Sequence, residues 1–178
     1  LLGGVINLGG DIRTWGIASA ERSAWRIGVA DPRAPADNAA PLTVLEISDR
    51  AVSSSGRYAR GFTINGVHYS HILDPRTGLP ANAVAATTVI ARDNATANAL
   101  ATTLSVLTPA EGMRLAAATP GVEAMIVGAD GVLHRLARTR HGTVAATLGG
   151  EIDDHRAWLH VPHHVGGHQQ RRAPPRDA

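Results

Sequence analysis

The residues best suited to chemistry lie in a short loop that begins with a histidine. Residues 71–78 read His-Ile-Leu-Asp-Pro-Arg-Thr-Gly, and Pro75 and Gly78 exclude a helix here. Histidine titrates near neutral pH, which makes it the side chain most often used as a general base. Asp74 or a backbone carbonyl group could orient the imidazole ring. We therefore interpret His71 as a candidate catalytic base.

A second candidate is a pair of polar side chains in a segment rich in Ala and Leu. Asn98 and Thr102 are four residues apart, so on a helix their oxygen atoms lie on one face about one turn apart. Two oxygen ligands at this spacing suit a hard cation such as Mg²⁺. The same residues are also compatible with a face that only contacts solvent.

Two glycine-containing segments are candidate ligand-binding turns. Residues 7–12 read Asn-Leu-Gly-Gly-Asp-Ile, where Gly10 lets the backbone approach a ligand closely and Asp11 can accept a hydrogen bond from it. Residues 53–58 read Ser-Ser-Ser-Gly-Arg-Tyr, in which the amide groups of Ser55 and Gly56, with nearby Arg side chains, could bind an anion. Each segment, taken alone, is also compatible with an ordinary surface turn.

Strand patterns dominate the first part of the chain. Residues 3–8 predict a buried strand, and residues 24–30 predict a second strand because apolar and polar residues alternate there. A proline-containing surface loop follows at residues 33–41. Residues 42–47 predict a third strand, and its inward residues are expected to be Leu42, Val44 and Ile47.

Turn and cap signals position the histidine and the polar pair. Asn65-Gly66 separates two short apolar segments and predicts a hairpin with a type I′ turn, which leads directly to His71. Asp93 is a predicted N-cap for a helix over residues 93–107. Pro109 predicts the start of a second helix over residues 109–119.

The remaining elements indicate the fold class. Residues 83–91 predict a long strand, and residues 122–127 are expected to pair with residues 132–136 in a hairpin. Hairpins combined with two adjacent helices, without regular alternation of strand and helix, favour an α+β fold with a mixed or antiparallel sheet.

Composition limits the possible functions. The chain of 178 residues is 44% hydrophobic, which is enough for one core and one domain over residues 1–137. Cysteine is absent, so disulfides and thiolate chemistry are excluded. The sequence pI is about 9.9, but residues 1–133 contain 10 Arg and 11 acidic residues. Because this part is not basic and only 3% of residues are aromatic, no nucleic-acid partner is expected.

The last part of the chain has a different composition. Residues 138–178 are rich in Arg, His, Pro and Gly, and we expect them to be a disordered or aberrant tail. Only residues 152–159 suggest a helix within it.

Taken together and in their order along the chain, the four candidate segments resemble the C-terminal half of the FAD:protein FMN transferases, the ApbE-like flavin transferases. The resemblance covers residues 1 to about 137, and residues 71–78 are its most specific part. It implies an ApbE-like fold that is incomplete at its N-terminus. Members of this family are often exported and membrane-anchored, so the cell envelope is the expected location.

The resemblance also implies a reaction and roles for individual residues. Such enzymes bind FAD and Mg²⁺ and attach FMN to a Thr or Ser hydroxyl group of a target protein, releasing AMP. By resemblance, His71 is the base that takes the proton from that hydroxyl group, and Asn98 and Thr102 are metal ligands. The residues implied for the flavin site are Gly10, Asp11, Ser55 and Gly56, with Arg76 as a source of positive charge.

The chain departs from the family pattern at the metal site. Position 98 is Asn where the family usually has Asp, so Mg²⁺ should bind more weakly unless Asp11 or Asp93 supplies a carboxylate. The family's upstream flavin-binding and metal-binding elements have no counterpart before Leu1, so we do not expect this chain alone to turn over.

Three alternatives to flavin transfer remain open at this stage. They are a non-catalytic flavin-binding remnant or scaffold, an FAD pyrophosphatase, and a serine hydrolase that uses Ser55 and His71. The last is disfavoured because no nucleophile-elbow pattern surrounds Ser55.

Overall fold

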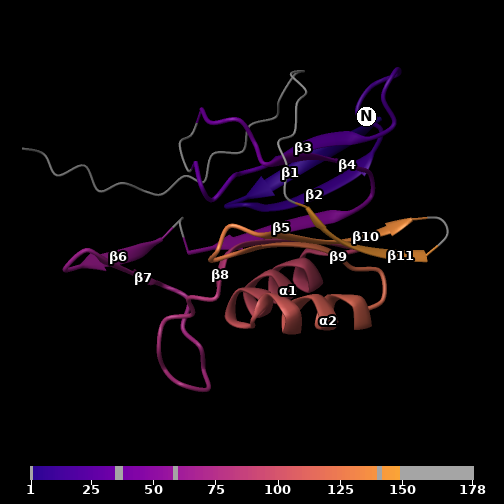
Figure 1. Ribbon diagram of the computed structural model, residues 1–178. Helices are drawn as coiled ribbons and strands as arrows, with labels where there is room; N and C mark the ends of the chain where they lie inside the picture. The colour runs from indigo at the N-terminus through magenta and orange to yellow at the C-terminus, as the bar shows by residue number, and fades with distance from the viewer. Residues whose placement is uncertain (1, 35–37, 58–59, 140–141, 149–178) are drawn as a thin grey trace, which may run out of the picture.

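The computed structural model describes residues 2–34, 38–57, 60–139 and 142–148, and most of its strands belong to one antiparallel sheet (Figure 1). The order in this seven-stranded sheet is β1-β2-β5-β8-β9-β10-β11. Its strands are β1 (Gly3–Leu8), β2 (Asp11–Gly16), β5 (Ala51–Gly56), β8 (Val84–Ala91), β9 (Glu123–Gly128), β10 (Leu133–Thr139) and β11 (Gly142–Leu148). The two-stranded sheets pair β3 (Trp25–Val29) with β4 (Thr43–Ile47) and β6 (Gly61–Ile64) with β7 (Val67–Ser70).

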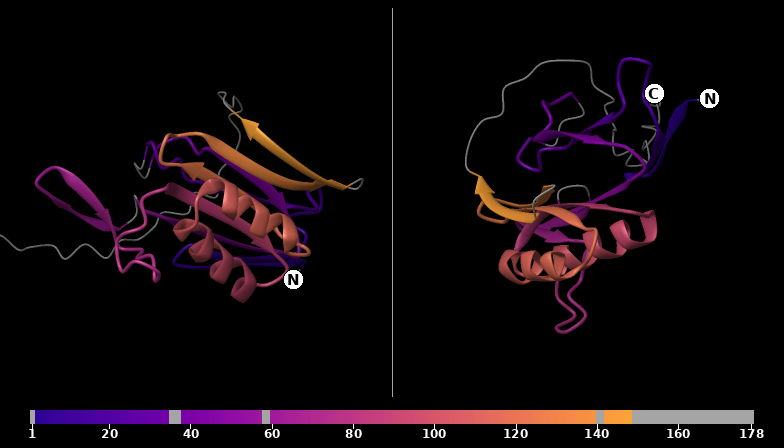
Figure 2. Two further views of the ribbon diagram at one scale, coloured as in Figure 1. Left: turned by 60° about the horizontal axis from the view of Figure 1, so that its bottom comes forward. Right: turned by 90° about the vertical axis from the view of Figure 1, so that its right-hand side faces the viewer.

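The seven-stranded sheet is buried on both faces, and this creates three layers. Along β9, Ala124 and Ile126 pack with the helices, whereas Met125 and Val127 pack with β3 and β4. The two apolar clusters therefore occupy opposite faces of the sheet, as the alternation of side chains along a strand requires. The right-hand view of Figure 2 shows the helices on one side of the sheet and the β3–β4 layer on the other. The predicted α+β fold is confirmed.

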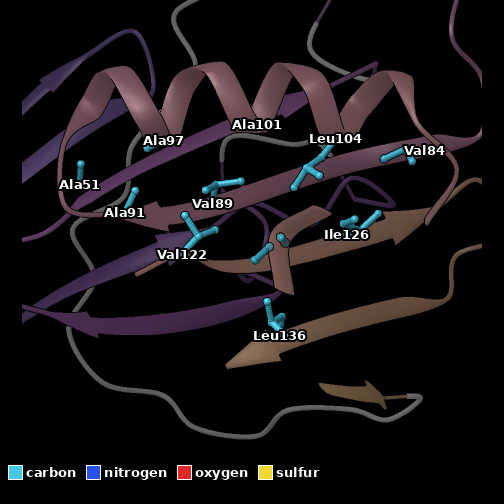
Figure 3. Close-up of a cluster of buried hydrophobic side chains, with 12 residues drawn as sticks. Ala51, Val84, Val89, Ala91, Ala97, Ala101, Leu104, Val122, Ile126 and Leu136 are labelled. Carbon is cyan, nitrogen blue, oxygen red and sulfur yellow. The ribbon is translucent and has the colours of Figure 1, made fainter. Parts of the chain in front are cut away.

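Two helices, α1 (Asn94–Val106) and α2 (Pro109–Ala118), cover one face of the sheet. Small residues allow α1 to approach closely, and Leu104 fills the space between α1 and the strands (Figure 3). Both helices begin as predicted. The Asp93 side chain accepts a hydrogen bond from the Thr96 amide, and Thr108 and Glu111 form a capping box. Among the described residues, no helix has both the length and the apolarity needed to cross a bilayer.

Two predictions of inward-facing residues were wrong. Strand β1 exists but is only partly buried: Val5 packs against the core, whereas Leu8 is 75% exposed. Among the described strands, β1 lies at the edge of the sheet and pairs with β2 alone. On β4 Ile47 is buried as predicted, and Leu42, just before the strand, packs against the same core. Leu45 is buried where Val44 was expected, and Val44 is only partly buried. Side chains alternate along a strand with a period of two, so Val44 and Ile47 cannot both face the core of a regular strand.

Three strands were not predicted, namely β2, β5 and β11. Strand β11 lies within residues 138–178, for which a disordered or aberrant tail was expected. Its Thr and Val residues favour a strand, and it pairs along its whole length with β10. Residues 149–178, with the suggested helix at 152–159, lie outside the described part of the chain, as does Tyr58.

Candidate active site

A cavity of about 830 Å³ lies between α1 and the loop that follows β7. It brings together five of the predicted site residues, which come from three separate parts of the chain: Ser55, His71, Arg76, Asn98 and Thr102. Apolar side chains from the same elements line the rest of the wall, including those of Ile72, Val106 and Leu107. The cavity falls within the size range of cofactor sites.

The β6–β7 hairpin positions His71. Its turn contains Asn65 and Gly66, both with positive φ (50° and 79°), as a type I′ turn requires. The resulting register pairs Gly61 with Ser70, so Arg60 and His71 follow as the next facing residues. His71 Nδ1 lies 2.9 Å from the backbone carbonyl oxygen of Arg60.

This contact determines which ring nitrogen of His71 is available as a base. A carbonyl oxygen only accepts hydrogen bonds, so Nδ1 of His71 must carry the hydrogen in the contact with Arg60. In the neutral ring the lone pair is then on Nε2. The side chain is exposed at the cavity, so Nε2 can receive a proton from a bound hydroxyl group.

The loop after His71 is held by hydrogen bonds within itself. The amide of Gly78 donates to the Asp74 carbonyl oxygen, and the amide of Asp74 donates to that of Leu79. The Arg76 guanidinium donates to both carboxylate oxygens of Asp74, and these hydrogen bonds lower the pKa of Asp74. Asp74 therefore orients Arg76 and not His71.

Helix α1 provides the polar wall of the cavity. Ala97, Ala101 and Leu104 are buried against the sheet, so Asn98 and Thr102 lie on the exposed side of the helix. Both line the cavity, one helical turn apart, as their spacing predicted.

Asp11 reaches α1 from the start of β2. The Asn98 side-chain amide nitrogen lies 3.1 and 2.9 Å from the two carboxylate oxygens of Asp11. The hydroxyl group of Ser53 on β5 also donates to Asp11. Gly9 and Gly10 have φ values of 64° and 102°, so the turn before Asp11 depends on glycine. Gly10 itself does not line the cavity.

The Ser-rich segment is a strand and not the turn or anion-binding loop considered from sequence. Residues 53–56 pair with β8, and the Ser54 hydroxyl bonds to that of Thr88. Burial and pairing in a central strand outweigh the low strand propensity of Ser and Gly. Ser55 lines the cavity, whereas Gly56 is buried beside it and does not. Ser53 was not predicted as a site residue, because its partner Asp11 is 42 positions away.

The residues present fit a hard divalent cation that is also bound by substrate oxygens. Asn98 and Thr102 offer uncharged oxygen ligands, and the Asp11 carboxylate lies beside Asn98. Within the described residues, no cluster of three His, Cys, Asp or Glu side chains forms a complete metal site. Mg²⁺ commonly uses one or two protein carboxylates and completes its coordination with phosphate oxygens and water.

Comparison with known proteins relates the chain to the ApbE family. The model of the ApbE family matches residues 2–126. An FAD:protein FMN transferase of Treponema pallidum is 35% identical over 134 residues, which cover 71% of this chain and 36% of that protein. The enzyme of the same name from Vibrio cholerae is 37% identical over 127 residues, covering 71% of this chain and 37% of its own length. The chain thus spans little more than a third of these curated relatives.

Solved structures agree in fold. The ApbE protein of Thermotoga maritima superposes with a TM-score of 0.66 at 36% identity, over 75% of this chain and 42% of that structure. The apo form of the flavinyl transferase ApbE of Pseudomonas stutzeri gives a TM-score of 0.56 at 30% identity, over 82% of this chain and 41% of that structure.

Proposed function

This chain belongs to the ApbE family, and we propose that it carries the catalytic histidine and part of the metal site of a Mg²⁺-dependent FAD:protein FMN transferase. The reaction moves FMN from FAD to a Thr or Ser hydroxyl group of a target protein and releases AMP. The observation that carries the proposal is the shared cavity, where His71, Asn98 and Thr102 meet.

His71 acts as the general base in this proposal. The acceptor hydroxyl oxygen attacks the phosphorus of the FMN moiety, the bond from that phosphorus to the oxygen of AMP breaks, and AMP leaves. The hydroxyl proton passes to Nε2 of His71, whose other nitrogen is anchored to the Arg60 carbonyl oxygen. A neighbouring carboxylate is not needed to orient the ring.

Asn98 and Thr102 would hold the metal ion through their side-chain oxygens. A bound Mg²⁺ ion neutralises phosphate charge and orients the pyrophosphate group of the substrate. Arg76 adds positive charge at the same cavity, although its pairing with Asp74 reduces that contribution. The apolar wall suits the aromatic rings of FAD.

The test uses the protein expressed from its complete gene, incubated with FAD, Mg²⁺ and an acceptor protein. Release of AMP together with flavin fluorescence that remains on the acceptor in a denaturing gel is the expected result. AMP and free FMN without labelled acceptor would identify an FAD pyrophosphatase. Flavin that binds without AMP release would identify a non-catalytic flavin-binding protein, and the transferase proposal would be abandoned.

A further inference from the structure

The contact between Asp11 and Asn98 settles how the Asn98 amide is oriented. A carboxylate only accepts hydrogen bonds, so the amide nitrogen of Asn98 must face Asp11, at 2.9 and 3.1 Å from its oxygens. The amide oxygen is then directed away from Asp11. This leaves that oxygen available to a ligand in the cavity that Asn98 lines.

The Asp11 carboxylate is held by uncharged hydrogen-bond donors within the described part of the chain. Its hydrogen-bond donors are the neutral side chains of Asn98 and Ser53. Among the ion pairs of the described residues, none includes Asp11. Asp93, the other nearby acid considered from sequence, uses its carboxylate to cap α1 through Thr96.

We infer that Asp11 and Asn98 act together as one charged metal-binding unit, an inference that rests on the proposed function. Asn98 supplies the coordinating oxygen, and Asp11 supplies the negative charge and fixes the amide. The carboxylate on the far side of the amide also polarises it and makes its oxygen a stronger ligand. Carboxylates that hydrogen-bond to a metal ligand commonly act in this way, and their loss weakens metal binding roughly 10- to 100-fold.

The test measures Mn²⁺ binding by electron paramagnetic resonance on the protein from its complete gene, without FAD or acceptor. Mn²⁺ is a hard cation that accepts the same oxygen ligands as Mg²⁺. Asp11→Asn should weaken Mn²⁺ binding about 10-fold or more. Glu46→Gln is the matched control, because it removes one exposed carboxylate from β4, on the other side of the sheet. This substitution should leave Mn²⁺ binding unchanged.

Exchanging the two side chains separates this role from a purely structural one. In Asp11→Asn/Asn98→Asp the charge is restored and the hydrogen bond persists with donor and acceptor exchanged, so Mn²⁺ affinity should recover to within about threefold of the parent. Asn98→Asp alone places two carboxylates in contact, so it should lower the melting temperature of the metal-free protein and enlarge the stabilisation by Mn²⁺.

Three results would overturn the inference. They are a parent protein that binds no Mn²⁺, an Asp11→Asn variant that is folded by circular dichroism and binds Mn²⁺ like the parent, and a double variant that binds no more tightly than Asp11→Asn. Because FAD and acceptor are absent, these results do not depend on whether the protein transfers FMN. If flavin transfer fails, the Mn²⁺ measurements still test the metal-binding inference independently.

Discussion

Replacement of His71 tests the assigned base most directly. The side chain is exposed, and its one hydrogen bond within the described residues is to the Arg60 carbonyl oxygen, so His71→Ala should change the free energy of unfolding by no more than about 0.5 kcal/mol. Flavin transfer should fall roughly 10²- to 10⁴-fold, the range for a lost general base. This corresponds to about 2.7 to 5.4 kcal/mol of transition-state stabilisation, at 1.36 kcal/mol for each factor of ten.

Two further variants separate proton transfer from anchoring. In His71→Gln the amide nitrogen can still donate to the Arg60 carbonyl oxygen, but Gln is not a base, so transfer should fall as far as in His71→Ala. His68→Ala is the matched control. His68 lies on the same hairpin and also contacts a backbone carbonyl oxygen, that of Arg57 at 3.0 Å, but it does not line the cavity.

The assay follows AMP release and acceptor labelling from pH 6 to 8, with FAD binding measured separately. The His71→Ala variant should bind FAD nearly as tightly as the parent does. Its transfer rate should no longer show the pH dependence that arises from protonation of the base. Full activity of His71→Ala over this range, or an equal loss in His68→Ala, would refute the role assigned to His71.

Three predictions concern stability, each measured by urea denaturation. Leu104 is 0% exposed between α1 and the sheet, so Leu104→Ala should lower the free energy of unfolding by about 2.5 to 5 kcal/mol. A decrease below about 1 kcal/mol would contradict this packing. Thr108→Ala removes the capping box of α2 and should lower the free energy of unfolding by about 1 kcal/mol. An unchanged free energy of unfolding would show that the capping box is dispensable. Hydrogen bonding to Arg33 lowers the pKa of Asp31 below 3.8. The ionised Asp31 therefore stabilises the folded protein above pH 3.8, and this stabilisation is lost as the pH falls through the lowered pKa. Asp31→Asn should therefore be less stable than the parent at pH 7 and equal to it in strong acid, and a difference that persists in acid would refute the ionic origin.

Local signals in the sequence predicted the elements that carry the histidine and the helix pair. Asn65-Gly66 specifies a tight turn, and a two-residue turn sets the register of its strands, so the facing positions of Arg60 and His71 follow from it. Asp93 marks the start of α1, and the helical period then places Asn98 and Thr102 on one face. These interactions span only a few residues, so composition and spacing determine them.

Other features depend on contacts between distant parts of the chain. Ser53–Gly56 has weak strand propensity by itself and becomes a strand because β8 pairs with it along its length. The same pairing, with the partner β2, places Asp11 beside Ser53 and within hydrogen-bond distance of Asn98, 87 positions away. Sequence reasoning identified Asp11 and Asn98 as candidates but left their contact open, and it did not include Ser53.

The sequence by itself therefore determined the family resemblance, the hairpin before His71 and the spacing of the helix pair, because each is encoded by neighbouring residues. Only the tertiary structure decided which carboxylate lies beside Asn98 and which hydroxyl group donates a hydrogen bond to that carboxylate. The physical reason is that sheet order and helix packing bring these groups together, and no local pattern of residues specifies the partner across such a separation.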